Sequence, residues 1–355
     1  MIALPKNEPL EKSQLMKAVF LVKNGSANQA FEIRETEKPS VGDQDVLIEI
    51  EAFGLNYAEV MARLGLYRDA PPLPFIPGYD CVGRVVDVGE NADKNWINKR
   101  VAAMMRFGSY AEYGVANQDA IVAIGEDLAA GVGAAIGVQY NTAYYSACES
   151  VNLFEGDTVL IHAAAGGVGT ALVQLAQWKS CRIIGIAGSD EKIEHLKKSG
   201  VHLAINRKKE NYLEVIEREF GKECVDVSFN AVAGTTFKKD MKLLNAGGRL
   251  VLFGASQRSS TGKSKMADMQ LLWSMGILFP IFLVGSSKSI IGVNMLRIAD
   301  AKPQVLKRVM HEVVKLIEQG ILAPQSGGEY SVTDIAKAHE WLEKGKTSGK
   351  VIVKW

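Results

Sequence analysis

A short turn made almost entirely of alanine and glycine, residues 163–169, constrains the fold of this chain more than any other segment. The five residues before it (158–162) are typical of a buried strand, and residues 167–178 have a helical pattern. Small residues between a strand and a helix let a pyrophosphate approach backbone N–H groups at the helix N-terminus. We therefore expect a dinucleotide site, rather than a glycine-rich turn without a ligand, formed by Ala164, Gly166, Gly167, Val168 and Gly169.

Strand and helix patterns alternate beyond this turn. The expected strands are 158–162, 182–187, 203–205, 225–230 and 249–254, and the expected helices are 167–178, 190–199, 212–220 and 235–244. Such alternation predicts a Rossmann-type, doubly wound parallel sheet. Its ligands bind at the carboxyl ends of the strands.

The first part of the chain has a β-rich pattern instead. Glycine, proline and asparagine turns separate strand-like runs at 17–22, 32–34, 46–53, 83–88 and 100–105, which predicts a compact β-barrel-type domain. The proline-rich residues 71–77 predict a loop. Further along, we expect a strand at 289–294, amphipathic helices at 305–318 and 333–344, and a last strand at 350–355 that returns to the β-domain.

A length of 355 residues favours two domains, here of an α/β protein. We expect a flexible leader at 1–15 and a β-type catalytic domain built from 16–140 and 295–355. The nucleotide-binding domain is expected at 141–294.

Charge and cysteine usage exclude several classes of protein. The formal net charge of +1 gives no general attraction to nucleic acid or anionic lipid. Four cysteines lie far apart without a C-x-x-C pair, which argues against a disulfide framework or a zinc knuckle. Together with a polar N-terminus that lacks the apolar stretch of a signal peptide, this predicts a reducing, cytoplasmic location.

The most apolar segment is 269–284, and Gly276 and Pro280 interrupt it. It is short for a transmembrane helix, which needs about 20 apolar residues. We expect buried core or a contact between copies of the chain, with peripheral contact with a membrane as the alternative.

The end of the second nucleotide-domain strand favours NADPH over NADH. An Asp or Glu usually binds the ribose 2′-OH of NAD there, but Gly188 and Ser189 occupy the place. Lys192 and Arg207 follow nearby, and two cations beside small residues suit a 2′-phosphate. The alternative is that both are solvated surface charges. Asp190 and Glu191 weaken the argument unless they point outward along the start of the helix.

Several motifs resemble a known family. They are residues 54–67 (GLNYAEVMARLGLY), 77–83 (PGYDCVG), 141–144 (NTAY), the turn at 163–169 and residues 349–351 (GKV). With the domain order, they resemble the medium-chain dehydrogenase/reductase superfamily and its zinc-independent quinone oxidoreductase group, of the zeta-crystallin type. The runs 65–74 and 269–283 look most like the vesicle amine transport protein homologs. The resemblance implies a GroES-like catalytic domain beside a Rossmann domain.

The chain departs from the zinc-dependent members of that superfamily. Gly78, Tyr79 and Asp80 stand where those enzymes have Gly-His-Glu, and Asn56 and Val138 stand near two of their metal ligands. A catalytic zinc needs three ligands. We therefore expect no metal, and hydride transfer from NADPH to quinones or α,β-unsaturated carbonyls, whose conjugation spreads the arriving charge.

The resemblance also assigns residues to roles. Asn56 is expected beside the nicotinamide ribose and the acceptor oxygen, to which its amide would donate. Tyr57 and Tyr67 are candidates to stack on the acceptor or donate a proton, with simple packing as the alternative for each. Further cofactor contacts are expected from Thr142, Tyr145, Asn230 (or capping of its strand turn), Phe253, Gly254, Val293, Asn294 and Lys350. For His162 we expect packing rather than general-base catalysis.

The resemblance implies a homodimer, with the strand at 289–294 as an edge that a second copy can pair with. An alternative function also remains open. The chain would then be an NADPH-binding adaptor with little enzymatic activity that uses residues 269–283 to contact a membrane or a partner protein.

Overall fold

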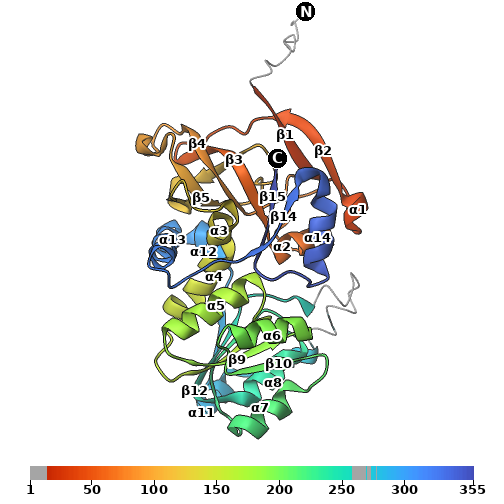
Figure 1. Cartoon of the computed structure of the whole chain (residues 1–355), viewed down its shortest axis with the longest axis vertical. Helices are drawn as coiled ribbons and strands as arrows, with labels where there is room; N and C mark the ends of the chain where they lie inside the picture. The colour runs from red at the N-terminus through yellow and green to blue at the C-terminus, as the bar shows by residue number, and fades with distance from the viewer. Residues whose placement is uncertain (1–13, 258–268, 270–272, 277) are drawn as a thin grey trace, which may run out of the picture.

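Two β-sheets, one above the other in Figure 1, organise the chain in a computed structural model that describes residues 14–257, 269, 273–276 and 278–355. Most of the expected leader and part of the apolar segment at 269–284 lie outside these residues. The N- and C-terminal parts of the chain build the upper half, and the middle of the chain builds the lower half (Figure 1).

The lower half is the Rossmann-type unit that the alternating pattern predicts. Its six strands run parallel in the spatial order β10-β9-β8-β11-β12-β13. Their bounds are Leu203–Asn206, Arg182–Ala187, Thr158–His162, Val225–Asn230, Leu244–Leu252 and Ser289–Gly292, respectively. Read in chain order, this is the 3-2-1-4-5-6 arrangement of a doubly wound sheet, whose strand order reverses between β8 and β11. The predicted fold class is confirmed.

Helices cover this sheet at the positions that the sequence predicts. They are α5 (Gly167–Trp178), α6 (Asp190–Lys198), α7 (Tyr212–Phe220) and α8 (Thr235–Leu243), followed by the short α11 (Pro280–Ser286). The close approach of α5 to β8 requires a glycine, because a Cβ atom at Gly169 would collide with the backbone of Ala163 and Ala164. Gly169 of the turn that binds pyrophosphate in Rossmann folds is thus also needed for the helix to pack against the strand.

The upper half is a mainly antiparallel sheet, with one parallel pair between β14 and β15, that both ends of the chain complete. Its order is β14-β15-β3-β4-β5-β7, and β6 also pairs with β3. The bounds are Ser326–Ser331, Lys350–Lys354, Asp45–Leu55, Asp80–Val88, Arg100–Met104 and Ile121–Ala123, with β6 at Tyr113–Asn117. The last strand, β15, lies antiparallel to β3 with Val353 opposite Phe53, as its return to the β-domain predicts. A separate ribbon pairs β1 (Leu15–Leu21) with β2 (Phe31–Glu37).

Helical segments connect and cover the upper sheet. The short α1 (Ala27–Ala30) and α2 (Tyr57–Arg63) precede a nearly continuous helical run formed by α3 (Ala130–Ala135), α4 (Asn141–Tyr144) and two π-helical turns, Ile136–Tyr140 and Tyr145–Ser150. Later come α12 (Met295–Ala301), α13 (Pro303–Glu318) and α14 (Ile335–Glu343), with single 3-10 turns at Lys94–Trp96, Gln118–Ala120 and Val332–Asp334. Residues 71–77 form the expected loop, which touches β1 through a bridge between Phe75 and Leu21.

One buried hydrophobic cluster joins the two halves. It includes Met104 of β5, Tyr140 of the π-helical turn and Leu172 of α5. This shared core fixes the carboxyl ends of the parallel strands relative to the antiparallel sheet, where the motif residues of the catalytic part lie.

Candidate active site

The glycine-rich turn places the N-terminus of α5 at the carboxyl end of β8. Gly166 caps the helix, and Thr170 N donates to Gly166 O at 2.8 Å. Gly167 has a second role that the sequence does not reveal, because a Cβ atom there would collide with the side chain of Gln139. The buried Gln139 Oε1 has no hydrogen-bond partner among the described residues, so an unsatisfied acceptor lies against this turn. An exposed helix N-terminus with small neighbours fits a bound pyrophosphate.

Two cations lie at the end of β9 and form no ion pair with a described residue. Lys192 is half-buried, and burial lowers its pKa; the nearby charge of Glu191 partly offsets this, and Arg207 lowers the pKa further. The Arg207 guanidinium lies 3.6 Å from where a Cβ of Gly188 would be and makes no ion pair with a described residue. Ser189 Oγ accepts from Lys192 N at 3.4 Å, which caps α6. This arrangement fits an additional phosphate on the adenosine ribose.

The carboxylate of Asp190 is bonded away from these cations. A carboxylate that faced them would repel the 2′-phosphate of NADPH. Its carboxylate accepts from Asn206 Nδ2 at 2.8 Å and from Lys209 Nζ at 2.6 Å. These two bonds lower the pKa of Asp190, the Lys209 bond contributing most. Asp190 therefore adds no hydrogen bond to the group formed by Lys192 and Arg207.

Residues 347–350 connect both ends of the site. Lys192 Nζ donates to Thr347 O at 2.7 Å, and Gly349 forms a backbone bridge with Gly166 of the turn. Gly349 has a φ of +87°, and a Cβ there would collide with Gln325 O, so glycine is required. The next residue, Lys350, carries its side chain into the upper sheet.

A buried polar cluster surrounds the Lys350 ammonium group. Lys350 Nζ lies 2.5 Å from Asp80 Oδ2 and donates to Asn56 Oδ1 at 2.9 Å. Asn56 Nδ2 donates to Asp80 Oδ2 at 2.9 Å and to Glu59 Oε1 at 3.3 Å, and Asn56 N donates to Glu59 Oε2 at 2.9 Å. Lys350 and Asp80 are fully buried and Glu59 is 2% exposed. Lys350 was expected to contact the cofactor, and here it orders Asn56 and Asp80.

Burial changes the protonation of Glu59, the second carboxyl group of the cluster. Burial raises its pKa from 4.5 to about 8, with a further increase from Asp80 that Lys350 partly offsets. At neutral pH the cluster therefore combines one ion pair with one neutral carboxylic acid. This avoids burying two negative charges beside a single ammonium group.

Both amide hydrogens of Asn56 are engaged within the protein, by Asp80 and Glu59. The expected donation from this amide to an acceptor oxygen would therefore have to replace one of these bonds. The Oδ1 atom of Asn56 accepts from Lys350 Nζ and also faces Glu59 N in the capping box that begins α2.

Aromatic side chains lie next to this cluster. Tyr79, directly before Asp80, packs against Phe107 with ring centroids 4.9 Å apart and meets Tyr67 edge-on at 6.0 Å. Tyr67 and Phe107 are half-buried, whereas Tyr79 is 3% exposed. Tyr57, the first residue of α2, is also half-buried.

The remaining expected cofactor residues have varied surroundings. Asn230 is fully buried, and its Oδ1 accepts from Val232 N and Ala233 N at 2.8 Å each, which is the turn-capping role given as its alternative. Thr142 is also buried and donates to Val138 O at 2.7 Å. Tyr145 and Phe253 are half-buried, Gly254 and Asn294 are exposed, and Val293 is 7% exposed.

Asn230 belongs to a buried network centred on Asp240. This carboxylate accepts from Asn230 Nδ2 at 2.6 Å, Tyr212 Oη at 2.7 Å and Ser228 Oγ at 2.8 Å, and it contacts His162 Nε2 at 2.9 Å. His162 is thus a buried structural partner below the turn, in agreement with the packing role expected for it.

No group of three or more metal-binding side chains occurs among the residues that the structure describes. The Lys350 ammonium group also lies against the carboxylate of Asp80, where a divalent cation would meet repulsion.

Comparison with known proteins identifies the family. Residues 42–126 match the alcohol dehydrogenase GroES-like domain, and residues 167–310 match the model described as zinc-binding dehydrogenase. Human quinone oxidoreductase is 30% identical over 342 residues, which cover 96% of this chain and 98% of that protein. The chain belongs to the medium-chain dehydrogenase/reductase family, in its quinone oxidoreductase group. This membership makes it an oxidoreductase.

Two further members of the group extend the comparison. The human synaptic vesicle membrane protein VAT-1 homolog is 29% identical over 342 residues, covering 96% of this chain and 86% of that protein. Mycobacterial Rv1454c, solved in complex with NADPH, has 25% identity and a TM-score of 0.81, covering 96% of this chain and all of that one. The nearly equal identities do not distinguish the vesicle-protein branch from the quinone oxidoreductases, so the narrower placement stays a prediction.

The sequence does not predict three residues of the site: Glu59, Gln139 and, as a neighbour of Tyr67, Tyr79. Glu59 lies within the motif at 54–67, but its burial depends on Asp80 and Lys350, which are distant in sequence.

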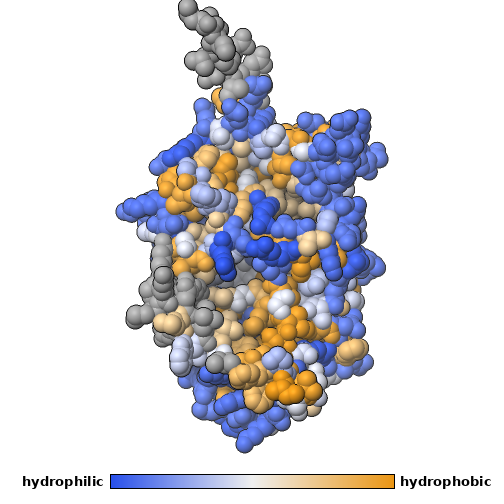
Figure 2. Space-filling model, turned by 180° about the vertical axis from the view of Figure 1, so that it is seen from behind, coloured by the Kyte–Doolittle hydropathy of each residue, from blue (hydrophilic) through white to orange (hydrophobic). Residues whose placement is uncertain are grey.

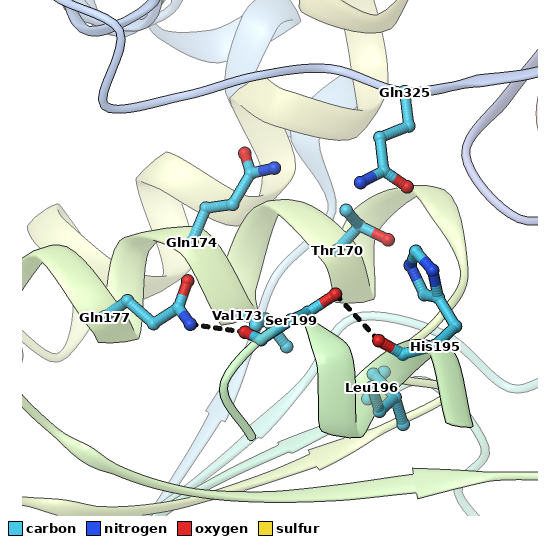
Figure 3. Close-up of a pocket in the computed structure, with 9 residues that line it drawn as sticks. Thr170, Val173, Gln174, Gln177, His195, Leu196, Ser199 and Gln325 are labelled. Carbon is cyan, nitrogen blue, oxygen red and sulfur yellow. Dashed lines mark hydrogen bonds between the residues drawn. The ribbon is translucent and has the colours of Figure 1, made fainter. Parts of the chain in front are cut away.

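A small pocket of about 110 Å³ lies between α5 and α6, apart from the expected cofactor site. Of the expected cofactor residues, Ala164 alone is among the residues that line it. Figure 3 shows Thr170, His195 and Gln325 around it, each from a different segment.

Proposed function

We propose that this protein is an NADPH-dependent, zinc-independent reductase of quinones or α,β-unsaturated carbonyls. The observation that carries the proposal is the pair of sites joined by residues 347–350. One end offers the cations Lys192 and Arg207, which form no ion pair with a described residue, and the other offers the polar cluster around Lys350. Family membership and the NADPH complex of Rv1454c support the choice of cofactor.

The residues that would hold NADPH fit its chemistry along its length. The α5 N-terminus and the turn at 164–169 suit the pyrophosphate, and Gly188, Ser189, Lys192 and Arg207 suit the 2′-phosphate. When bound, NADPH supplies a hydride and becomes NADP⁺, while the acceptor takes its proton from water. Thr142, Tyr145, Phe253 and Gly254 are proposed neighbours of the nicotinamide half, with Val293 and Asn294 opposite.

The catalytic part would contribute orientation and hydrogen bonding. Lys350 and Asp80 fix the Asn56 amide, which is proposed to lie beside the nicotinamide ribose. Tyr67 and Tyr57 are the phenols beside this cluster that would contact the acceptor, by stacking or by donating a hydrogen bond to the oxygen on which negative charge develops.

The proposal of zinc independence is supported by the donor set. The position facing Asn56 and Asp80 contains an ammonium group, and the described residues include no set of three ligands there. A conjugated acceptor needs less electrophilic assistance than a simple alcohol or ketone, because its charge spreads over several atoms.

The decisive experiment follows NADPH absorbance with purified protein, an ortho-quinone and an enone panel, after metal analysis. We expect turnover by a preparation with far less than one zinc per chain. Binding of NADPH without reduction of any acceptor would instead favour the adaptor function. Activity that disappears with a chelator and returns with zinc would contradict zinc independence.

We also propose a homodimer that pairs β13 with the same strand of a second copy. β13 ends the described sheet, so its outer edge has no described partner, and α11 beside it exposes apolar side chains. These are Phe279, Ile281, Phe282 and Val284, between 55% and 74% exposed. In Figure 2, hydrophobic side chains gather on the lower half of the rear face. None of the described helices is long and apolar enough to cross a bilayer.

A further inference from the structure

The buried hydroxyl group of Tyr79 makes no hydrogen bond of normal length within the part of the chain that the structure describes. The side chain is 3% exposed. A buried hydroxyl that leaves water without gaining a partner lowers stability, and native proteins contain few such groups. Replacing this tyrosine with phenylalanine would remove that cost, so the hydroxyl calls for a functional explanation.

The ring of Tyr79 is held in place on several sides. Tyr79 O accepts from Met105 N at 2.8 Å, and the following residue, Asp80, is anchored by Lys350. Phe107 packs on the ring at 4.9 Å, and Tyr67 meets it edge-on at 6.0 Å. The direction of the hydroxyl is therefore set by the surrounding packing.

Tyr67 is the phenol that lies beside Tyr79. The two hydroxyls are close enough to interact, which raises the pKa of Tyr79 and lowers that of Tyr67, although Tyr79 Oη makes no hydrogen bond of normal length to a described residue. Burial is the main cause that raises both pKa values, so both groups remain protonated donors at neutral pH. Tyr67 is the more exposed of the two. It lies on a loop that Asp69 ties to α12 through Arg297 at 2.5 Å.

We propose that Tyr79 is a positioning residue whose hydroxyl donates to Tyr67 Oη when an acceptor binds, which aims the Tyr67 hydroxyl at the acceptor's carbonyl oxygen. This inference rests on the proposed function, since it assumes a conjugated carbonyl acceptor. Another donor is needed for that oxygen, because both amide hydrogens of Asn56 are donated to Asp80 and Glu59. Hydrogen bonds in a chain polarise one another, so Tyr67 becomes a better donor. Neither phenol loses its proton.

A double-mutant cycle with Tyr79→Phe and Tyr67→Phe tests the proposal. The control is the half-buried Tyr113→Phe, which removes a bond to Glu49 and keeps the ring. The readouts are kcat/KM for an ortho-quinone, the Kd of that quinone for enzyme saturated with NADP⁺, and Tm. We expect Tyr79→Phe to lower kcat/KM about tenfold. It should also weaken quinone binding several-fold and leave Tm unchanged or higher.

The decisive result is the double variant, which should match Tyr67→Phe alone, because Tyr79 acts only through Tyr67. Effects that multiply in the double variant, an unchanged kcat/KM in Tyr79→Phe, or a lowered Tm would each overturn the inference. If the wild-type protein turns over quinones and Tyr79→Phe equals it, the inference alone fails. If the wild-type protein neither reduces nor binds any quinone or enone, the proposed function fails as well.

Discussion

Lys350 Nζ and Asp80 Oδ2 lie 2.5 Å apart, and neither side chain is exposed to solvent. The two residues come from strands that do not pair directly, β15 and β4, with β3 between them. Their ion pair therefore joins three strands of the upper sheet at the point where the Asn56 amide is oriented.

Breaking this pair from one side should be costly. We expect Lys350→Met or Asp80→Asn to lower the free energy of unfolding by about 3–5 kcal/mol, because each leaves an uncompensated buried charge or donor. The double variant Asp80→Asn/Lys350→Met should recover most of the loss in urea denaturation. Lys354→Met, on the same strand, removes an exposed pair with Glu329 and should cost about 1 kcal/mol or less. Additive losses in the double variant would refute this account.

Glu59 should make stability depend on pH. Its folded pKa, about 8, exceeds the ordinary value of 4.5. The stabilisation from the bound proton is therefore complete below pH 4.5 and is lost as pH rises to 8. Relative to Glu59→Gln, the wild-type protein should lose on the order of a few kcal/mol across this window. Denaturation curves from pH 5 to 9 measure the difference, with exposed Glu35→Gln as the control. A constant difference would mean that Glu59 does not titrate there.

Lys192 and Arg207 should determine the preference for a phosphorylated cofactor. We expect Lys192→Ala or Arg207→Ala to raise the Kd of NADPH roughly tenfold or more, because a charge-assisted bond to the 2′-phosphate is lost. The Kd of NADH should change little. Lys209→Ala, which removes one of the two bonds to Asp190 and leaves the bond from Asn206, serves as the matched variant in the same fluorescence titration. Equal losses for NADPH and NADH would contradict a phosphate site.

The exposed apolar face of α11 should hold two copies together. We expect wild-type protein to have the mass of a dimer by light scattering, and Ile281→Asp/Phe282→Asp to reduce it to a monomer. Phe154→Asp, which changes an apolar residue of similar exposure elsewhere, should leave the mass unchanged. A monomeric wild-type protein that co-sediments with liposomes would favour the membrane-facing alternative instead.

Sequence patterns predict the nucleotide half well. The observed bounds of β8, α5, β9, α7 and β11 equal the expected ones, because strong apolar periodicity and capping residues mark them. β12 begins at Leu244 rather than at residue 249. A pairing of Leu244 with Val225 before a register shift extends it, and the intervening residues 245–248 (NAGG) give no strand signal.

The catalytic half was less predictable. β6 and β7 are short, and β14 has the polar, glycine-rich sequence SGGEYS, so its strand conformation depends on pairing with β15 rather than on its own residues. The burial of Glu59 and the engagement of both Asn56 hydrogens are tertiary effects. Motif resemblance located Asn56 and Lys350, but no local pattern reports that they contact one another.

The position of β15 between β14 and β3 has a consequence for biosynthesis. The six parallel strands occupy one continuous stretch of chain, so their sheet can close while translation still proceeds. The antiparallel sheet must wait for β15, and until it arrives Asp80 lacks its counter-ion. During synthesis the half that emerges first from the ribosome is therefore the half that matures last.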